Sequence, residues 1–187
     1  FLILSSCEEE RTYETMSDAE GNVYRIKPYN DVVWMIDNLR STKTKGGQSI
    51  RFYNVNKNPN LFAQYGLLYD YATACNICPT GWEIPNNNDW DKLIQGSGAE
   101  KSADVFKSKS AWNGEANSNA YEFDVHPTGF GNNRDLPNEF NKKALFWSKS
   151  YEGTLAWSYI FEAGSNEIRN AEQHMHYAFS VRCIKRL

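Results

Sequence analysis

The chain has 187 residues, 41% of them hydrophobic, which is enough for a single domain with a substantial core. Its 20 Lys and Arg residues against 23 Asp and Glu residues give a net charge of −3, which argues against a nucleic-acid partner. No apolar run reaches the roughly 18 residues that a membrane-spanning helix needs.

Residues 1–10 resemble the end of a bacterial lipoprotein signal followed by an acidic tether. An apolar run leads to Leu4-Ser5-Ser6-Cys7, which resembles a lipobox whose cysteine is acylated, and the three glutamates at 8–10 resemble the surface-export signal of Bacteroidetes lipoproteins. A disordered tail, or a short buried strand that ends in cysteine, is the alternative. We expect lipidation at Cys7, an outer-membrane or cell-surface location, and a single folded domain over 11–187.

The first part of this domain predicts antiparallel strands. Residues 11–36 alternate between apolar and polar side chains and contain turn sequences at 18–21 and 29–31. The polar stretch 41–64 predicts a loop. A short strand at 66–69 and a short helix at 71–76 follow, with Asp70 as the candidate N-cap of that helix.

The stretch 78–94 predicts a turn that leads into an amphipathic helix. Any of the asparagines at 86–88 can cap this helix, and Gly96 is placed to end it. Trp90, Leu93 and Ile94 have the spacing of one helical face, so Trp90 is expected to pack inward. We therefore interpret this stretch as scaffold and not as a catalytic site.

The remainder of the chain predicts an irregular region followed by strands. Residues 96–143 are rich in Asn, Gly, Ser, Lys and Asp and carry widely spaced aromatic residues. Strands are predicted at 144–148, 156–161 and 177–184.

The cysteines predict one disulfide. With Cys7 assigned to the lipid, three cysteines remain, and an exported protein is expected to oxidise two of them. We favour a Cys78–Cys183 bridge with Cys75 unpaired, and Cys75–Cys183 is the alternative. Cys75 and Cys78 have the spacing of redox and zinc motifs, but the sequence offers neither a second cysteine pair nor a βα unit before them.

Six ordered motifs together resemble the Fibrobacter succinogenes major paralogous domain, which occurs in exported proteins and lipoproteins. The motifs are DAEGNVY at 18–24, VWMIDNL at 33–39, GLLY at 66–69, CPTGWEIP at 78–85 with Trp90, FWS at 146–148 and FSVRC at 179–183. The resemblance runs from about residue 12 to the C-terminus.

This resemblance implies an α+β, C-type-lectin-like fold, which the family shares with the formylglycine-generating enzyme. Twisted antiparallel sheets, two short helices, a long irregular loop region, and N- and C-terminal strands that lie together are then expected. The two cysteines of the family correspond to Cys78 and Cys183. No general activity is established for the family, so the resemblance implies a fold and a location but no reaction.

We expect a binding protein and not an enzyme. The formylglycine-generating relative uses two reactive cysteines near its C-terminus together with copper, whereas Cys183 has no second thiol within several residues. The sequence contains no Gly-x-Ser-x-Gly elbow, and no pair of acids stands out as a glycosidase pair. His174 and His176 could bind zinc or copper if extended, although an exposed strand or loop is the simpler interpretation.

The ligand face is expected in the irregular region, where aromatic rings lie beside amides and a guanidinium that suit sugars or peptides. The candidate ligand-binding residues are Trp112, Tyr121, Asn133, Arg134 and Asp135, with core packing as the alternative for Trp112.

We expect no cofactor. A calcium site is the alternative, and its ligand oxygens would come from Asp124, Asn132, Asn133, Asp135 and Asn138. The expected partner is a glycan, a peptide or an envelope protein. The competing interpretation is a structural or accessory subunit of an outer-membrane or fimbrial complex that binds no small ligand.

Overall fold

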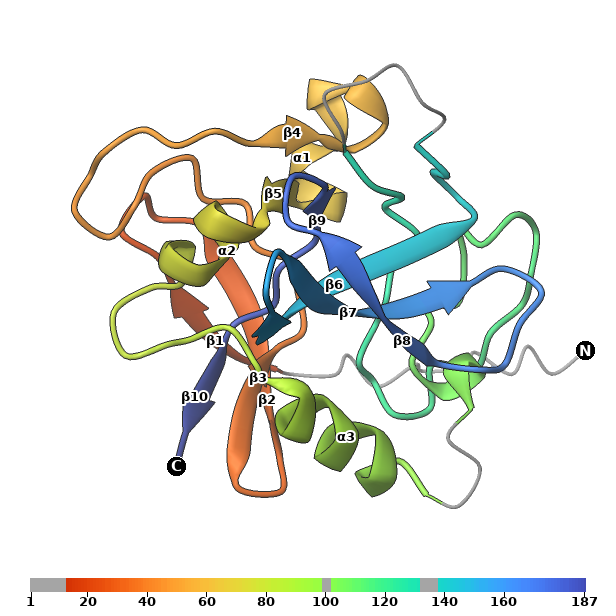
Figure 1. The fold of residues 1–187 in the computed structure, drawn as a ribbon. Helices are drawn as coiled ribbons and strands as arrows, with labels where there is room; N and C mark the ends of the chain where they lie inside the picture. The colour runs from red at the N-terminus through yellow and green to blue at the C-terminus, as the bar shows by residue number, and fades with distance from the viewer. Residues whose placement is uncertain (1–12, 99–101, 132–137) are drawn as a thin grey trace, which may run out of the picture.

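The computed structural model describes residues 13–98, 102–131 and 138–187. Within these ranges the chain forms a mixed α+β domain with three antiparallel sheets and three short α-helices (Figure 1). None of the described helices is long and apolar enough to cross a membrane. The expected α+β class is confirmed. The expected Cys7 lipid site lies outside the described residues.

The first sheet brings together strands from opposite ends of the chain, in the order β1-β2-β3-β10. Its strands are β1 (Glu14–Ser17), β2 (Val23–Tyr29), β3 (Val32–Met35) and β10 (Ile184–Arg186). Ile184 of β10 lies opposite Trp34 of β3. The N- and C-terminal strands therefore share one sheet, as expected, with β10 next to β3 and not next to β1.

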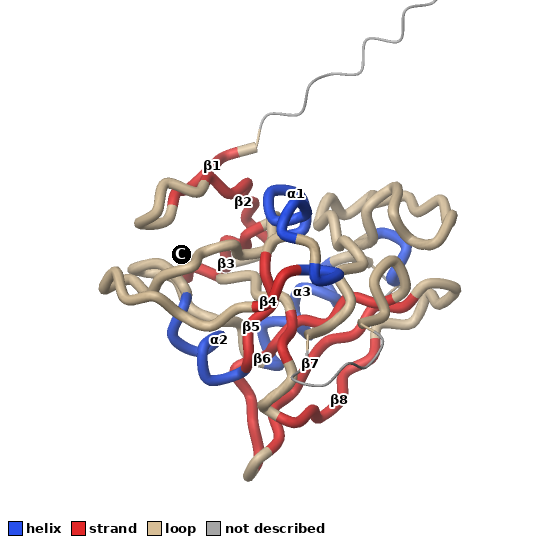
Figure 2. Tube along the Cα trace, turned by 90° about the horizontal axis from the view of Figure 1, so that it is seen from above, coloured by secondary structure: helices blue, strands red, loops and turns tan. Residues whose placement is uncertain are grey.

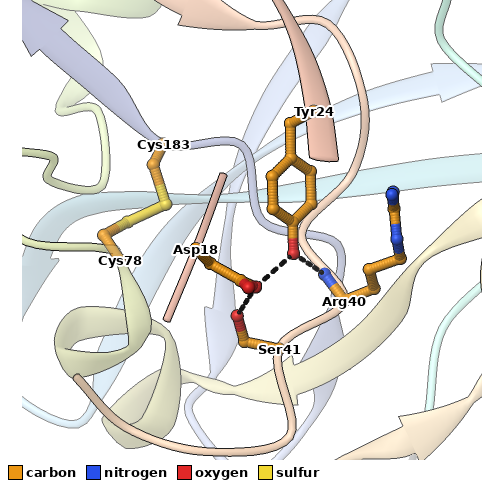
Figure 3. Close-up of a disulfide and its surroundings, with 6 residues drawn as sticks. All are labelled: Asp18, Tyr24, Arg40, Ser41, Cys78 and Cys183. Carbon is orange, nitrogen blue, oxygen red and sulfur yellow. Dashed lines mark hydrogen bonds between the residues drawn. A yellow bond between two sulfur atoms is a disulfide. The ribbon is translucent and has the colours of Figure 1, made fainter. Parts of the chain in front are cut away.

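A single carboxylate holds the turn between β1 and β2 (Figure 3). The Oδ2 atom of Asp18 accepts hydrogen bonds from the hydroxyl groups of Tyr24, at 2.8 Å, and Ser41. Its Oδ1 atom accepts from the backbone N–H of Asn22 at 3.0 Å. Burial alone would raise the pKa of Asp18, but these hydrogen bonds outweigh it and lower the pKa. The turn is thereby fixed to the segment that follows β3.

The second sheet has the order β4-β5-β9, with β4 at Tyr53–Asn54, β5 at Leu67–Asp70 and β9 at Ala178–Phe179. The stretch between β4 and β5 forms two 3₁₀ helices, η1 (Val55–Lys57) and η2 (Pro59–Leu61), and α1 (Phe62–Tyr65). The predicted loop at 41–64 is therefore wrong at its end. A helix of four residues is too short to produce an apolar period in the sequence.

The two longer helices begin at side-chain caps. Asp70 accepts a hydrogen bond from the backbone N–H of Thr73 at 2.9 Å and caps α2 (Tyr71–Ile77). Asn86 and Asp89 form a capping box at the start of α3 (Asn87–Gly96). Trp90 is fully buried on α3 and stacks on Tyr159 with ring centroids 5.0 Å apart. The scaffold interpretation of this stretch is consistent with these contacts.

The disulfide connects the end of α2 to the chain just before β10. Cys78 bonds to Cys183, and Cys75 is free and exposed. The favoured pairing is confirmed. The bond indicates an oxidising, extracytoplasmic location.

The third sheet has the order β6-β7-β8 and separates two cores. Its strands are β6 (Lys143–Glu152), β7 (Leu155–Glu162) and β8 (Arg169–His174), and Figure 2 shows β8 at the outer side of this sheet. Leu145 and Ile160 belong to the core beside α2 and β9, whereas Phe146 and Phe161 belong to the core beside α3. Both faces of the central strand β7 are therefore occupied.

The predicted strand at 177–184 is divided in the structure. Ala178 and Phe179 form β9, and Ile184 begins β10 in the first sheet. Between them, Ser180 donates its N–H to the Leu145 carbonyl at 3.0 Å, and the Cys183 carbonyl accepts from the Met35 N–H at 3.0 Å. The segment passes from the second sheet, through a contact with β6 of the third sheet, to the first sheet, so a single strand cannot form.

Among the described residues between α3 and β6, the structure has one short 3₁₀ helix, η3 (Ala103–Val105), and no α-helix or strand.

Candidate functional site

A cavity of about 300 Å³ lies on the face of the third sheet that looks toward β9. We call it the sheet pocket. It has an apolar floor (Leu145, Ile160 and Ala171), an aromatic wall (Phe130, Tyr177 and Phe179) and a polar rim (Lys143, Glu162, Arg169 and Gln173). The volume is at the lower end of the range for ligand pockets.

The floor follows from the pairing of the three strands. Leu145 of β6 is in register with Ile160 of β7, and Ile160 is in register with Arg169 of β8. Because alternate residues of a strand share a face, residues two positions away from these lie on the same face of the sheet, and several of them line the pocket. Ala171 is one of them, and its small side chain leaves space above β8.

The wall is positioned by backbone pairing outside the sheet. Gly131 and Ala178 exchange two backbone hydrogen bonds of 2.8 Å, which places Phe130 beside Tyr177. Their rings meet edge-on at 5.9 Å and 84°, and Tyr177 lies parallel to Phe179 at 6.2 Å. These aromatic rings therefore come from two distant segments of the chain.

Gly129 is needed to bring Phe130 to this position. Its φ is +67°, and a Cβ there would lie 1.8 Å from the carbonyl oxygen of Asn138. No other residue fits without moving the backbone.

The rim contains two cations that share one carboxylate. The Oε1 atom of Glu162 lies 3.0 Å from Nζ of Lys143, and its Oε2 atom lies 2.7 Å from Nη2 of Arg169. Burial alone would raise the pKa of Glu162, but the hydrogen bonds from Lys143 and Arg169 lower it below its ordinary value. The carboxylate is ionised at neutral pH, so the three groups together carry one positive charge.

Two neutral polar groups lie at the pocket, the amide of Gln173 on its rim and the hydroxyl of Tyr177 on its wall. Within the described part of the chain, neither the amide of Gln173 nor the hydroxyl of Tyr177 has a hydrogen-bond partner in the protein. Both lie at the pocket and remain able to donate and accept. The pocket therefore combines an apolar surface, aromatic rings, neutral hydrogen-bonding groups and a positive charge.

A larger cavity of about 440 Å³ lies between the β1–β2 turn, residues 41–45 and the turn after Cys78. Its two carboxylates are used within the protein. Asp18 holds the hairpin turn, as described above, and Glu20 accepts from the backbone N–H groups of Thr42, at 2.6 Å, and Lys43, at 3.0 Å. We assign these groups to loop fixation and not to a ligand.

The predicted ligand residue Trp112 is fully buried, which corrects the expectation that it offers a surface to a ligand. Its indole N–H donates to the carbonyl of Val125 at 3.0 Å, and Nζ of Lys107 lies 4.9 Å from its ring centroid. The alternative of core packing applies because the ring fills the interior beneath the irregular region.

Tyr121 is half-buried at the edge of the same core. Its ring contacts Tyr29 at 4.8 Å and Phe106 at 5.0 Å between centroids. Its hydroxyl would be 2.7 Å from a Cβ added at Gly96. Asn133, Arg134 and Asp135 lie outside the described residues, so only Trp112 and Tyr121 of the predicted set are placed.

Two of the candidate calcium ligands, Asp124 and Asn138, lie within the described residues, and both make contacts with other side chains. Asp124 lies 2.8 Å from Nη2 of Arg25 and 3.6 Å from Nε2 of His126. Burial alone would raise its pKa, but His126 and Arg25 lower it. Asn138 donates to Asn56 at 3.1 Å. Asn132, Asn133 and Asp135 lie outside the described residues.

The histidine pair lies near the pocket without forming a metal cluster. The rings of His174 and His176 stack with centroids 5.3 Å apart, and His176 also packs against Tyr177 at 4.7 Å. Among the residues that the structure describes, no group of three or more His, Cys, Asp and Glu side chains is placed to hold a metal ion.

Sequence reasoning missed most of the pocket. Its signal is weak: each of three segments carries an apolar residue two positions from a charged one, as in Lys143/Leu145, Ile160/Glu162 and Arg169/Ala171. This spacing places both side chains on one face of a strand. The strand at 169–174 is mostly polar, so its apolar alternation was too weak to predict it.

Comparison with known protein families finds a match over most of the chain. The Fibrobacter succinogenes major domain matches residues 28–185, a range that includes the sheet pocket and both bridged cysteines. No curated protein matches the chain, and no solved structure matches it. The match identifies no ligand, so the ligand has to be argued from the pocket.

Proposed function

The chain belongs to the Fibrobacter succinogenes major domain family, and we propose that it is an exported, non-catalytic binding domain whose ligand site is the sheet pocket. The observation that carries this proposal is the convergence of an apolar floor, an aromatic wall and a polar rim in one cavity. Ligand sites are typically concave, largely apolar and supplied with a few placed polar groups. A segment of a glycan or a peptide fits this chemistry.

The proposal also covers the fold type of the domain and its location in the cell. We take it to be C-type-lectin-like, which is supported by the joint N- and C-terminal sheet and by the long connection between α3 and β6, whose described residues contain only one short 3₁₀ helix. We also take it to be anchored at the cell surface through an acylated Cys7, because residues 4–7 resemble a lipobox. Mass spectrometry of the N-terminal peptide of the native protein would show the lipid, and an unmodified Cys7 would exclude it.

The accessory-subunit alternative is less well supported. It calls for apolar side chains grouped on an exposed face. Among the described residues, the exposed large hydrophobic side chains are Val23, Tyr151 and Leu187, which belong to three separate parts of the chain. This distribution favours a pocket ligand over an apolar assembly surface.

A pocket-filling substitution tests the proposal. We would screen the wild type and Ala171→Trp against arrays of extracellular polysaccharide fragments and of peptides. The indole should occupy the space above the floor and reduce binding of the wild-type ligand at least about tenfold, since burial of the ligand is lost. Ala72→Trp, an exposed position on α2, is the matched control and should bind normally.

Two results would contradict the proposal. One is the absence of binding to either class of array by the folded wild type. The other is binding that Ala171→Trp and Ala72→Trp leave equally strong. Thermal unfolding of all three proteins establishes that each is folded.

A further inference from the structure

We propose that the ligand of the sheet pocket is an acidic glycan, held through the carboxylate of a uronic-acid ring by Arg169 and Lys143. This inference rests on the proposed function and specifies the class of ligand. Its basis is the arrangement of charge on the rim relative to the apolar floor.

The rim has cationic capacity that the protein does not use. Glu162 engages one nitrogen of Arg169 and the ammonium of Lys143. Within the described residues, Arg169 makes no further hydrogen bond, so its remaining N–H groups are available to an incoming carboxylate. An Arg with a free planar edge suits a carboxylate because it can donate two parallel hydrogen bonds.

Selection of an acidic ligand depends on the charge of the pocket rim and not on the net charge of the chain. The whole chain has a net charge of −3, so long-range attraction does not draw an anion to it. The rim itself carries two cations and one anion, and its excess positive charge lies directly beside the cavity. Selection of an acidic ligand is therefore expected to occur at short range.

The rest of the pocket favours a sugar over an acidic peptide. A pyranose ring has an apolar C–H face and a periphery of hydroxyl groups. Ile160 and Tyr177 offer surfaces to the face, and the amide of Gln173, which has no partner among the described residues, is able to exchange hydrogen bonds with the hydroxyls. An acidic peptide would also use the cations, and its backbone can pair with this amide, so the preference for a sugar rests on the apolar and aromatic surface that suits the C–H face of a ring.

The test compares an acidic ligand with its ester, which lacks the negative charges and carries one added methyl group on each ring. Binding of trigalacturonate and of its fully methyl-esterified form to the full chain would be measured by calorimetry, with a trimer of glutamate as the peptide arm. We expect trigalacturonate to bind at least about tenfold more tightly than the ester, since charge-assisted hydrogen bonds are lost in the ester. The glutamate trimer should bind more weakly than trigalacturonate.

Variants of the rim should move the affinity in opposite directions. Arg169→Gln should weaken binding of trigalacturonate about tenfold. Glu162→Gln should strengthen it about two- to fivefold, because the competing internal carboxylate is removed. Lys149→Gln is the control: Lys149 lies on the same strand as Lys143 but pairs with Glu83 outside the pocket, so this variant should not change the affinity.

The outcomes separate this inference from the proposed function. Equal binding of acid and ester, abolished by Ala171→Trp, would overturn acid selection and leave the pocket as a ligand site. Tighter binding of the glutamate trimer would overturn the choice of a sugar. Failure of both galacturonate forms to bind would overturn this inference, and the array screen would then decide the proposed function independently.

Discussion

Arg182 is fully buried and links three parts of the chain. Its guanidinium donates to the Oδ1 atom of Asn38 at 2.9 Å, to the carbonyl of Asp124 at 2.9 Å, and to the carbonyl of Phe123. It also lies 4.5 Å from the ring centroid of Phe123 and 5.2 Å from that of Phe146. Burial lowers the pKa of Arg182 to about 10, so the side chain remains charged at neutral pH.

Replacement of Arg182 should destabilise the domain. In Arg182→Met the cost of burying the charge is recovered, but three oxygen atoms lose their donor, and we expect a net loss of about 2–3 kcal/mol in the free energy of unfolding. Urea unfolding measures this loss. The control is Lys185→Met, at an exposed position three residues away, which should change stability by less than about 0.5 kcal/mol. Equal stability of the two variants would show that Arg182 does not support the fold.

At the scale of elements, the sequence predicted best the helices with a side-chain cap and the strands with a strongly apolar sequence. Asp70 and the asparagines before Trp90 were identified as caps, and both helices begin there. The strand at 155–162 was predicted closely, at 156–161, because it is strongly apolar. The prediction failed where a strand depends on partners far away in the chain. The segment after Phe179 leaves one sheet for another. Strand β8 was not predicted because its side chains are mostly polar and it forms by pairing with β7.

The disulfide between elements should contribute strongly to stability. It closes a separation of 105 residues, and the chain-entropy account gives about 4–5 kcal/mol for such a loop. We expect the Cys78→Ser, Cys183→Ser double variant to lose up to this amount in the free energy of unfolding. Cys75→Ser should lose little, because Cys75 is free and exposed.

Comparing the double variant with Cys75→Ser also tests which cysteines form the disulfide. Adding reductant should lower the unfolding midpoint of Cys75→Ser to that of the double variant. A reductant-insensitive Cys75→Ser protein would contradict the Cys78–Cys183 bond.

At the scale of the whole molecule, the site depends on registers that one sequence does not specify. The sequence predicted a binding face in the irregular region, and Trp112 was chosen because aromatic rings in polar segments resemble ligand surfaces. The fold buries Trp112, and the sheet pocket, which we propose as the ligand site, is assembled from β6, β7, β8 and the Gly131–Ala178 contact. Lys143 and Arg169 become neighbours only through their common partner Glu162 on the strand between them.

The most direct measurement is an NMR titration of the ¹⁵N-labelled chain with trigalacturonate. Our account predicts that amide shifts concentrate around Gly131, Ala171 and Ala178, which border the sheet pocket, and that Ala171→Trp removes them. Shifts concentrated instead beside Tyr121, or around Met16 and Trp82 at the larger cavity, would contradict the assignment of the ligand site to the sheet pocket.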